Sequence, residues 1–245
     1  MNICYVITRS DSIGGAQVHV LELASALLEE GHDVTVLVGQ KGPFTRELER
    51  RGVPFRSLRY LVRPIEPFLD TRALYELTQE LRRLRPELVG THSSKAGWIG
   101  RIAAKLLGIP STFTVHGWAF TEGVPRRRRH LYKVAEQLVA PIGDRIITVS
   151  EYDRQLAIKE KVAPADKIVT IHNGVRDVPD RLRAHPEQTP VQLVMVARFD
   201  APKDHHLLLQ ALRMLREYPW NLALIGDGPL RREVEQAVQL LGLAG

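Results

Sequence analysis

The chain has 245 residues, of which 44% are hydrophobic and 25% charged, so it can bury a sizeable core and has neither a disordered nor a fibrous composition. A net charge of +6 and a pI near 9.6 favour anionic partners: nucleotide phosphates, nucleic acid or a membrane surface. One cysteine, Cys4, cannot form an internal disulfide. Since neither a signal peptide nor an apolar run of membrane-spanning length is recognisable, we expect a cytoplasmic location.

Apolar segments alternate with amphipathic ones over residues 1–172, a pattern typical of an α/β protein with a parallel sheet. Predicted strands occupy residues 3–8, 32–38, 53–58, 88–92, 111–115, 145–149 and 169–172. Predicted helices occupy residues 16–30, 44–51, 71–84, about 125–139 and 151–161, and another ends at residue 107. Candidate functional residues are therefore sought at the carboxyl ends of the strands.

The first strand is followed by the loop SDSIGGAQ and a helix. Gly14 and Gly15 allow close backbone approach and unusual dihedral angles, and the helix start offers free N–H groups to a ligand. A tight strand–helix turn is the simpler interpretation. The pattern GxGxxG is absent, which argues against NAD. We expect His19 on the helix surface.

Two later strands end in histidines that would face a cleft. His92 is followed by Ser93 or Ser94 as a helix N-cap, and Lys95 near that helix start is unfavourable for the helix, which suggests an anionic partner. His116 closes the strand at residues 111–115 and is a candidate general base, with a structural loop histidine as the alternative.

A basic run, Arg126, Arg127, Arg128 and Arg129, opens a helix with one apolar side. It could meet anionic lipid headgroups, at roughly 1 kcal/mol per basic residue, or nucleic acid, or be a solvated run of charge. Few aromatic residues accompany the arginines, which argues against single-strand stacking.

The last third begins with Asn173 and Gly174, read as a turn or as a ligand contact, and a polar linker at residues 177–190. A strand at residues 192–197 is expected to be buried on both faces, and a helix starts at His205. Between them, Arg198 offers a planar fork and Lys203 a point charge beside a helix N-terminus, so together they could hold a diphosphate without a metal. A solvated loop is the alternative. A strand at 221–225, a turn at 226–229 and a helix at 231–241 follow.

Several of these segments resemble the GT-B retaining glycosyltransferases of glycosyl transferase group 1, family 4, in particular those that build bacterial surface polysaccharides. The matching segments, in chain order, are GGAQVHVLELASAL, HSSKAGWIGRIAAKLLGIP, DRIITVSEYDR, KIVTIHNGV, ARFDAPKDHHLLLQAL and LALIGDGPLRREVE. The resemblance implies two Rossmann-like domains, an acceptor-side domain at residues 1–176 and an incomplete donor domain at 191–245, joined by the linker.

The resemblance also implies an activity: transfer of a sugar, with retention, from a nucleotide-sugar such as a UDP- or GDP-sugar to a lipid-linked or saccharide acceptor, without a metal cofactor. It assigns the donor to Gly14, Gly15, Asn173, Gly174, Arg198 and Lys203, catalysis to Arg198, Lys203 and His116, the acceptor side to His92, Ser94 and Lys95, and an anionic membrane surface to Arg126–Arg129.

Two alternatives remain open. The family's pair of glutamates eight positions apart has no counterpart in the expected context, which would suit a catalytically incompetent fragment that binds nucleotide-sugar or acceptor. A basic nucleic-acid-binding module is supported by net charge alone.

Overall fold

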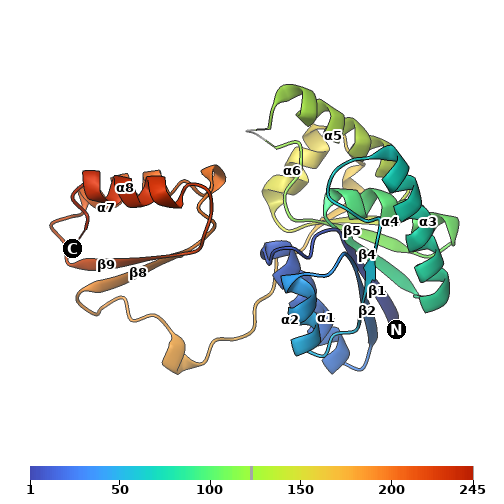
Figure 1. The fold of residues 1–245 in the computed structure, drawn as a ribbon, viewed down its shortest axis with the longest axis horizontal. Helices are drawn as coiled ribbons and strands as arrows, with labels where there is room; N and C mark the ends of the chain where they lie inside the picture. The colour runs from blue at the N-terminus through green and yellow to red at the C-terminus, as the bar shows by residue number, and fades with distance from the viewer. Residues whose placement is uncertain (122–123, 245) are drawn as a thin grey trace. The chain divides into compact units, whose positions relative to one another are not determined.

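The structure is a computed structural model that describes residues 1–121 and 124–244. The chain divides into two compact units, unit 1 from Met1 to Val175 and unit 2 from Arg176 to Gly245 (Figure 1). Each unit has its own sheet and its own buried core, and each is described by itself.

The described part of unit 1 is built on a seven-stranded parallel sheet. The strands lie in the order β3-β2-β1-β4-β5-β6-β7, so the order reverses at β1. Their bounds are β1 (Asn2–Ile7), β2 (Asp33–Gly39), β3 (Phe55–Leu58), β4 (Leu88–His92), β5 (Ser111–Val115), β6 (Arg145–Thr148) and β7 (Ile168–Thr170). The helices are α1 (Gly15–Glu29), α2 (Pro43–Arg50), α3 (Pro67–Leu84), α4 (Ser94–Leu106), α5 (Arg126–Val139) and α6 (Glu151–Lys159).

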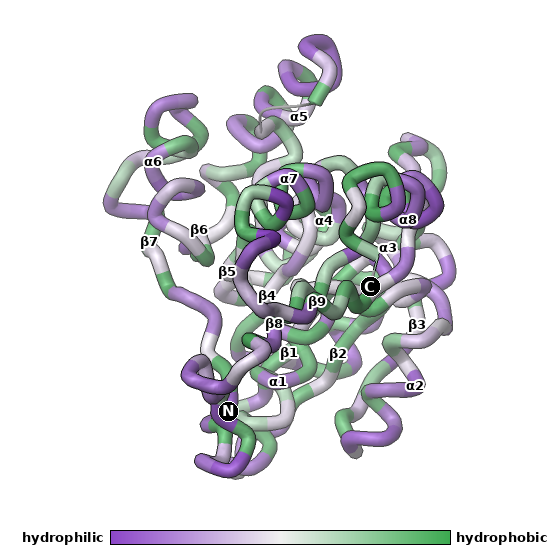
Figure 2. The backbone as a smooth tube through the Cα atoms, turned by 90° about the vertical axis from the view of Figure 1, so that its left-hand side faces the viewer, coloured by the Kyte–Doolittle hydropathy of each residue, from purple (hydrophilic) through white to green (hydrophobic). Residues whose placement is uncertain are grey.

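Helices cover both faces of this sheet because successive side chains of a strand point to opposite sides. Ile3, Tyr5 and Ile7 of β1 pack with α1 and α2 in one buried cluster. Cys4 and Val6 pack with α3 and α4 in a second cluster on the other face. In Figure 2, β1 and β2 are accordingly coloured mostly as hydrophobic, as expected for strands buried on both faces.

The predicted α/β class is confirmed, and most element bounds agree to within two residues. The bounds of β4 and β5 are those predicted. The largest difference is at α3, which begins at Pro67 and not at Thr71. Proline is tolerated in the first helical turn, where its missing N–H would have no partner, so Pro67 marks a helix start.

Unit 2 contains a parallel pair of strands, β8 (Val191–Val196) and β9 (Trp220–Ile225), and two helices, α7 (His205–Met214) and α8 (Arg231–Leu240). Both helices lie on the same face of the pair (Figure 1). Their buried side chains Leu209 and Val234 meet Phe199 from the loop after β8 in a small core.

The prediction that the strand at residues 192–197, which is β8 in the structure, is buried on both faces is wrong. Along β8, half-buried and exposed residues alternate, and Val194 and Val196 are 64% and 75% exposed. Helices cover one face of a two-stranded sheet here, so alternate residues lack a packing partner in unit 2. The apolar residues of a strand show that it can be buried, but they do not show whether other elements cover one of its faces or both.

Candidate functional site

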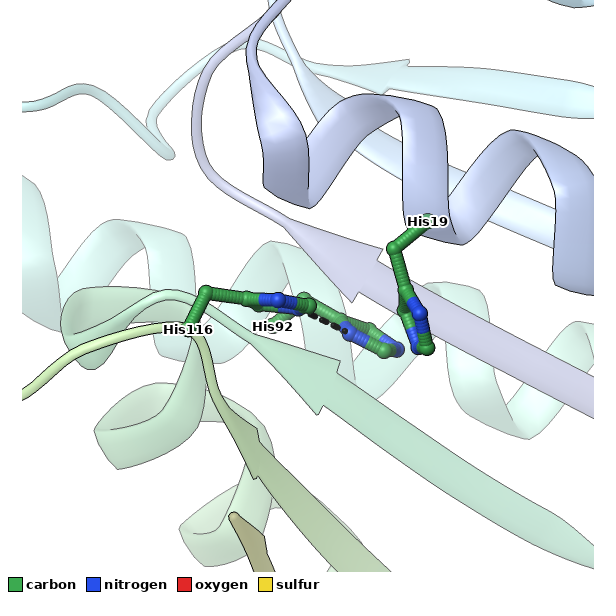
Figure 3. Close-up of side chains that lie close together, drawn as sticks. All are labelled: His19, His92 and His116. Atoms are coloured by element: carbon green, nitrogen blue, oxygen red, sulfur yellow. Dashed lines mark hydrogen bonds between the residues drawn. The ribbon is translucent and has the colours of Figure 1, made fainter. Parts of the chain in front are cut away.

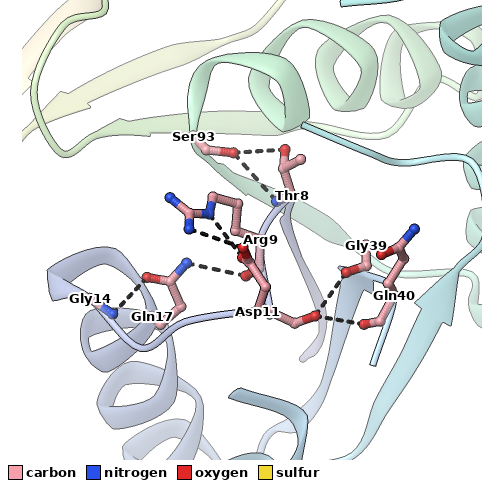
Figure 4. A network of polar contacts seen from close by, with 9 residues as sticks. Thr8, Arg9, Asp11, Gly14, Gln17, Gly39, Gln40 and Ser93 are labelled. Atoms are coloured by element: carbon pink, nitrogen blue, oxygen red, sulfur yellow. Dashed lines mark hydrogen bonds and ion pairs between the residues drawn. The ribbon is translucent and has the colours of Figure 1, made fainter. Parts of the chain in front are cut away.

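The strand order of unit 1 reverses between β1 and β4, and ligands of open α/β sheets bind beyond the carboxyl ends of the strands at such a point. At this edge, Thr8 follows β1 and Ser93 follows β4, and their hydroxyl oxygens are 2.9 Å apart (Figure 4). Ser93 has φ +82°, an unusual value for a residue with a side chain. The hydrogen bond to Thr8 holds that backbone turn, which directs the chain from β4 into α4.

Two further polar side chains shape the loop after β1 (Figure 4). The Ser10 hydroxyl lies 2.9 Å from the carbonyl oxygen of Gly39 and 2.7 Å from that of Gln40, so it links this loop to the end of β2. The side chain of Gln17 donates to the Arg9 carbonyl at 3.1 Å and accepts from the Gly14 N–H at 3.1 Å. The loop is therefore fixed by its own hydrogen bonds.

Three histidines from different elements meet at this edge (Figure 3). His19 comes from the second turn of α1, His92 ends β4 and His116 follows β5. His92 Nδ1 and His116 Nε2 are 3.2 Å apart, and the His19 ring lies 4.9 Å from the His116 ring and 5.6 Å from the His92 ring, measured between centroids. His92 is buried, whereas His19 and His116 are half-buried. We call this group the histidine cluster.

The pKa values of all three histidines are lowered, which favours neutral imidazoles at neutral pH. Burial, followed by the neighbouring His116 and His19, lowers the pKa of His92 well below its usual value. Burial, reinforced by His19, lowers the pKa of His116 to about 4. Burial also lowers the pKa of His19, against the opposing effect of a hydrogen bond with the Asn173 side chain. Each neutral imidazole keeps one nitrogen lone pair that can accept a hydrogen bond or bind a cation.

Sequence reasoning placed His92 and His116 at the sheet edge but treated His19 as a surface residue. The structure turns His19 toward the other two rings, and its hydrogen bond brings Asn173 to the same place. The sequence position of His19 could have indicated this placement, because the residue lies just after the first turn of the helix that follows β1, close to the carboxyl edge of the sheet. Gly117, at φ +115°, lets the chain turn away immediately after His116.

A pocket of about 210 Å³ opens beside this edge. Trp98 and Tyr132 form an aromatic wall with ring centroids 6.4 Å apart, Arg63 supplies positive charge, and Arg9 lies there paired with Asp11 at 2.9 Å. The remaining lining residues are Thr8, Ile65, Ser93, Ser94, Lys95 and Ala119. The pocket thus combines apolar faces with a few polar groups, which is the usual composition of a ligand site.

Ser94 and Lys95, both predicted on the acceptor side, line this pocket, but the role expected of the lysine charge needs correction. The Lys95 side chain is 7% exposed and forms an ion pair with Asp70 at the start of α3. It also donates to the carbonyl oxygen of Pro64. The anion that the sequence suggested for this ammonium is therefore a residue of the chain itself, 25 positions earlier in the sequence.

The unusual dihedral angles expected at Gly14 and Gly15 are not found, because neither residue has a positive φ. Gly14 is the N-cap of α1 with an extended conformation, φ −128° and ψ −174°. A Cβ added at Gly15 or Gly174 would have no neighbouring atom within 4 Å. These positions leave room for a ligand to approach the backbone.

The basic helix α5 differs from its prediction in two respects. Arg126, Arg127 and Arg128 are exposed, whereas Arg129 is paired with Glu160 at 3.6 Å. The helix also leaves two residues of its expected apolar side, Leu131 and Leu138, 58% and 70% exposed.

Helix α5 is held in place by a buried ion pair that its periodicity does not reveal. Glu136 is 1% exposed and accepts from Arg101 Nη2 and from Trp98 Nε1, each at 2.8 Å. Arg101 is fully buried and lies over the Phe113 ring.

No described helix is both long enough and apolar enough to cross a membrane.

In unit 2, Arg198 and Lys203 lie on the loop between β8 and α7, and both are exposed. Arg198 Nε is 3.5 Å from a carboxylate oxygen of Asp200. The N-terminus of α7, expected to attract a ligand anion, is capped by Asp204, whose carboxylate accepts from the Leu207 N–H at 3.2 Å. The N-terminus of α7 is therefore occupied by a side chain of the chain itself, and the positive charge of this loop comes from Arg198 and Lys203.

Two glycines of the segment Gly226-Asp227-Gly228 hold the Arg198 loop by close approach. A Cβ at Gly226 would lie 1.9 Å from the Ala197 carbonyl oxygen, and one at Gly228 would lie 2.4 Å from that of Phe199. Phe199 is anchored further by stacking on His205, with ring centroids 4.4 Å apart. Only glycine fits at these two places, which fixes the backbone on both sides of Arg198.

The structure is that of an α/β protein with a pocket at the carboxyl edge of the sheet in unit 1 and a loop that carries Arg198 and Lys203 in unit 2. The sequence profile of Glycosyltransferase Family 4 matches residues 13–177. The chain therefore belongs to Glycosyltransferase Family 4, as its motifs predicted.

Two curated relatives come from Escherichia coli. The chain is 34% identical over 164 residues to the UDP-Gal:alpha-D-GlcNAc-diphosphoundecaprenol alpha-1,3-galactosyltransferase, an alignment that covers 66% of this chain and 42% of the relative. It is 25% identical over 229 residues to the O-antigen biosynthesis glycosyltransferase WbnH, covering 93% and 63%. The chain thus spans less than two thirds of the length of either relative.

Solved structures establish the fold. Anabaena Alr3699/HepE, determined in complex with UDP and glucose, matches with a TM-score of 0.76 at 18% identity, covering 100% of this chain and 67% of that one. A glycosyltransferase from Rickettsia africae matches with a TM-score of 0.74 at 21% identity, covering 99% and 65%. The GT-B type predicted from the sequence is confirmed by these neighbours.

Proposed function

We propose that the protein is a glycosyltransferase of cell-surface polysaccharide synthesis that moves a sugar from a nucleotide-sugar to a saccharide or lipid-linked acceptor with retention of configuration. The observation that carries the proposal is that the carboxyl edge of the sheet, in a Family 4 chain, holds both a pocket and a cluster of three histidines. The relative that acts on a diphosphoundecaprenol acceptor supports the lipid-linked class.

In this proposal, Arg198 and Lys203 bind the donor diphosphate and offset the negative charge that develops on it as it leaves. No metal is assigned to this task. His116 contacts the donor sugar, Gly15 and Gly174 leave room for the reacting groups, and Gly14 lies beside them at the start of α1. His92 and Ser94 belong to the acceptor side, where Arg63 suits a phosphorylated acceptor and Trp98 and Tyr132 its apolar parts.

Nucleotide binding tests the donor assignment. Titration of the chain with UDP and with GDP should show binding of at least one of them, and Arg198→Ala should weaken it by about 1.5–3 kcal/mol, the range for hydrogen bonds to charged groups. Arg213→Ala, on the exposed side of α7, is the matched control and should bind as the parent does. Unchanged affinity in folded Arg198→Ala would remove Arg198 from the site. EDTA should leave the affinity unchanged.

Product analysis tests the activity. The chain is incubated with a panel of nucleotide-sugars and with either a sugar diphosphate lipid or a free saccharide acceptor, and the products are identified by mass spectrometry. Transfer with the configuration of the donor preserved supports the proposal. Nucleotide-sugar binding without transfer to any acceptor would favour the alternative of a binding fragment.

We also propose that α5 attaches the protein to an anionic membrane surface. Arg126, Arg127 and Arg128 are exposed, and Leu131 and Leu138 are exposed seven residues apart on one side of the same helix. This combination of basic and apolar residues is typical of helices that lie in a membrane interface.

Vesicle sedimentation tests the attachment. The parent should bind vesicles with anionic lipid better than neutral ones, and salt should release it. Replacing the three exposed arginines of α5 by glutamine should abolish the difference, whereas the same replacement of Arg46, Arg50 and Arg82 on α2 and α3 should not. Equal binding of the parent to both vesicle types would contradict the proposal.

A further inference from the structure

The histidine cluster has the donor atoms and much of the geometry of a transition-metal site. Among the described residues, His19, His92 and His116 each offer a ring nitrogen, and these nitrogens lie within 4.8 Å of one another. A tetrahedral zinc ion with Zn–N bonds of about 2.0–2.1 Å separates neighbouring ligand nitrogens by about 3.3–3.4 Å. His92 Nδ1 and His116 Nε2 are already 3.2 Å apart, so two of the three ligands have the required separation.

We propose that His19, His92 and His116 bind Zn²⁺ or a similar borderline transition-metal ion, with His92 Nδ1, His116 Nε2 and one nitrogen of His19 as ligands. Three protein ligands leave a fourth tetrahedral position for water or a substrate oxygen. The all-imidazole set selects the chemistry of the ion, because imidazole suits zinc, copper and nickel, whereas magnesium and calcium take oxygen ligands.

The surroundings of the cluster support this assignment. Histidines that bind metals commonly use their second nitrogen in a hydrogen bond that fixes the ring. The His19 ring makes a hydrogen bond with the Asn173 side chain, which leaves its other nitrogen for an ion. His92 is packed against Tyr5, with ring centroids 5.3 Å apart, so the innermost ligand is held by the core. His19 and His116 are half-buried, which leaves a path for an ion from solvent.

Only His19 has to move. It projects from the second turn of α1, and a change in its side-chain torsions would bring its ring nitrogen, now within 4.8 Å of the other two ligand nitrogens, to the tetrahedral separation without moving the sheet. His92 ends β4 and His116 directly follows the adjacent parallel strand β5, and the register of the two strands pairs His92 with Thr114, two positions before His116. The part of the site that needs precision is therefore on rigid elements, and the part that adjusts is a single side chain.

Cobalt binding tests the site, since tetrahedral Co²⁺ has visible absorption that Zn²⁺ lacks. Titration of the whole chain with Co²⁺ should give a tetrahedral spectrum that saturates at one ion per chain, and added Zn²⁺ should abolish it. His19→Gln and His116→Gln should each weaken binding at least about 100-fold, because loss of a supporting second-shell partner alone costs 10–100-fold.

The control variants are His185→Gln and His206→Gln, exposed histidines of unit 2, which should bind Co²⁺ as the parent does. Absence of a tetrahedral spectrum in the parent would overturn the assignment. So would an undiminished spectrum in folded His19→Gln, or loss of the spectrum in either control.

One consequence rests on the proposed function: an ion at the sheet edge would occupy the space of the reacting sugars, so Zn²⁺ should inhibit transfer, and His19→Gln should raise the inhibitory concentration. The spectroscopic test does not depend on activity. A cobalt spectrum in a chain without transferase activity would uphold the site and refute the function, whereas transfer without a cobalt spectrum would do the reverse.

Discussion

The histidine cluster should make unit 1 less stable in mild acid. The pKa of His116 is about 4 in the folded protein, against an ordinary value of 6.5. Between these values the unfolded state binds more protons than the folded state, so the free energy of unfolding decreases as pH falls through this window. The contribution of His116 is present at neutral pH and is lost in acid.

The size of the effect follows from the two pKa values. At about pH 5 the unfolded imidazole is almost fully protonated and the folded one is mostly neutral. Linkage then gives a loss of about 2 kcal/mol from His116 between pH 7 and about pH 5. If the folded pKa of His116 lay one unit closer to its ordinary value, the loss of unfolding free energy between the two pH values would still be about 1.5 kcal/mol. His92 and His19 add to the loss in the same direction, because their pKa values are lowered too.

Urea unfolding followed by far-ultraviolet circular dichroism, at pH 7 and at about pH 5, measures this loss. His116→Gln should reduce the difference between the two pH values by about 2 kcal/mol or more, since it also relieves His92 of a neighbouring charge. His19→Gln should reduce it by less. If folded His116→Gln keeps the full pH dependence of the parent, the cluster is not the cause.

Three further predictions concern unit 1. Glu136→Ala should lower the free energy of unfolding by about 3–5 kcal/mol, because it leaves the buried Arg101 charge without its partner; a loss below about 1 kcal/mol in urea unfolding would contradict this. Cys4 is fully buried and burial raises the pKa of its thiol, so an aromatic disulfide reagent should react with it only as urea unfolds the unit. Gly117→Ala should destabilise by about 1–2 kcal/mol, since φ is +115° there, while Gly15→Ala, in open space at a helix start, should be close to neutral by the same measurement.

The sequence predicted best those features that depend on neighbouring residues. The strands β4 (LVGTH) and β5 (STFTV) are short segments that contain several β-branched residues, and their bounds and the position of His92 and His116 at the sheet edge followed from these segments. His19 was misjudged because the face of a helix that meets a site depends on how the helix lies on its sheet. One-dimensional periodicity does not contain that orientation.

Long-range pairing explains the other failures. Lys95 has the local environment of an anion-binding lysine, but its partner Asp70 comes from a different helix. The apolar side expected for α5 is partly exposed because the buried Glu136 pairs with Arg101 of α4. In both cases a charge is satisfied by a residue 25 or 35 positions away, which neither composition nor spacing could indicate.

The one-sided sheet of unit 2 bears on how the chain behaves in concentrated solution. On the face that α7 and α8 leave uncovered, Val194 pairs with Ala223 and Val196 pairs with Ile225. The carboxyl half of that face is therefore hydrophobic, whereas Gln192 and Asn221 make the other half polar. Exposed apolar surfaces beside unpaired strand edges promote aggregation. Because this association is hydrophobic, it weakens on cooling. We therefore expect the chain to aggregate least in dilute solution at low temperature.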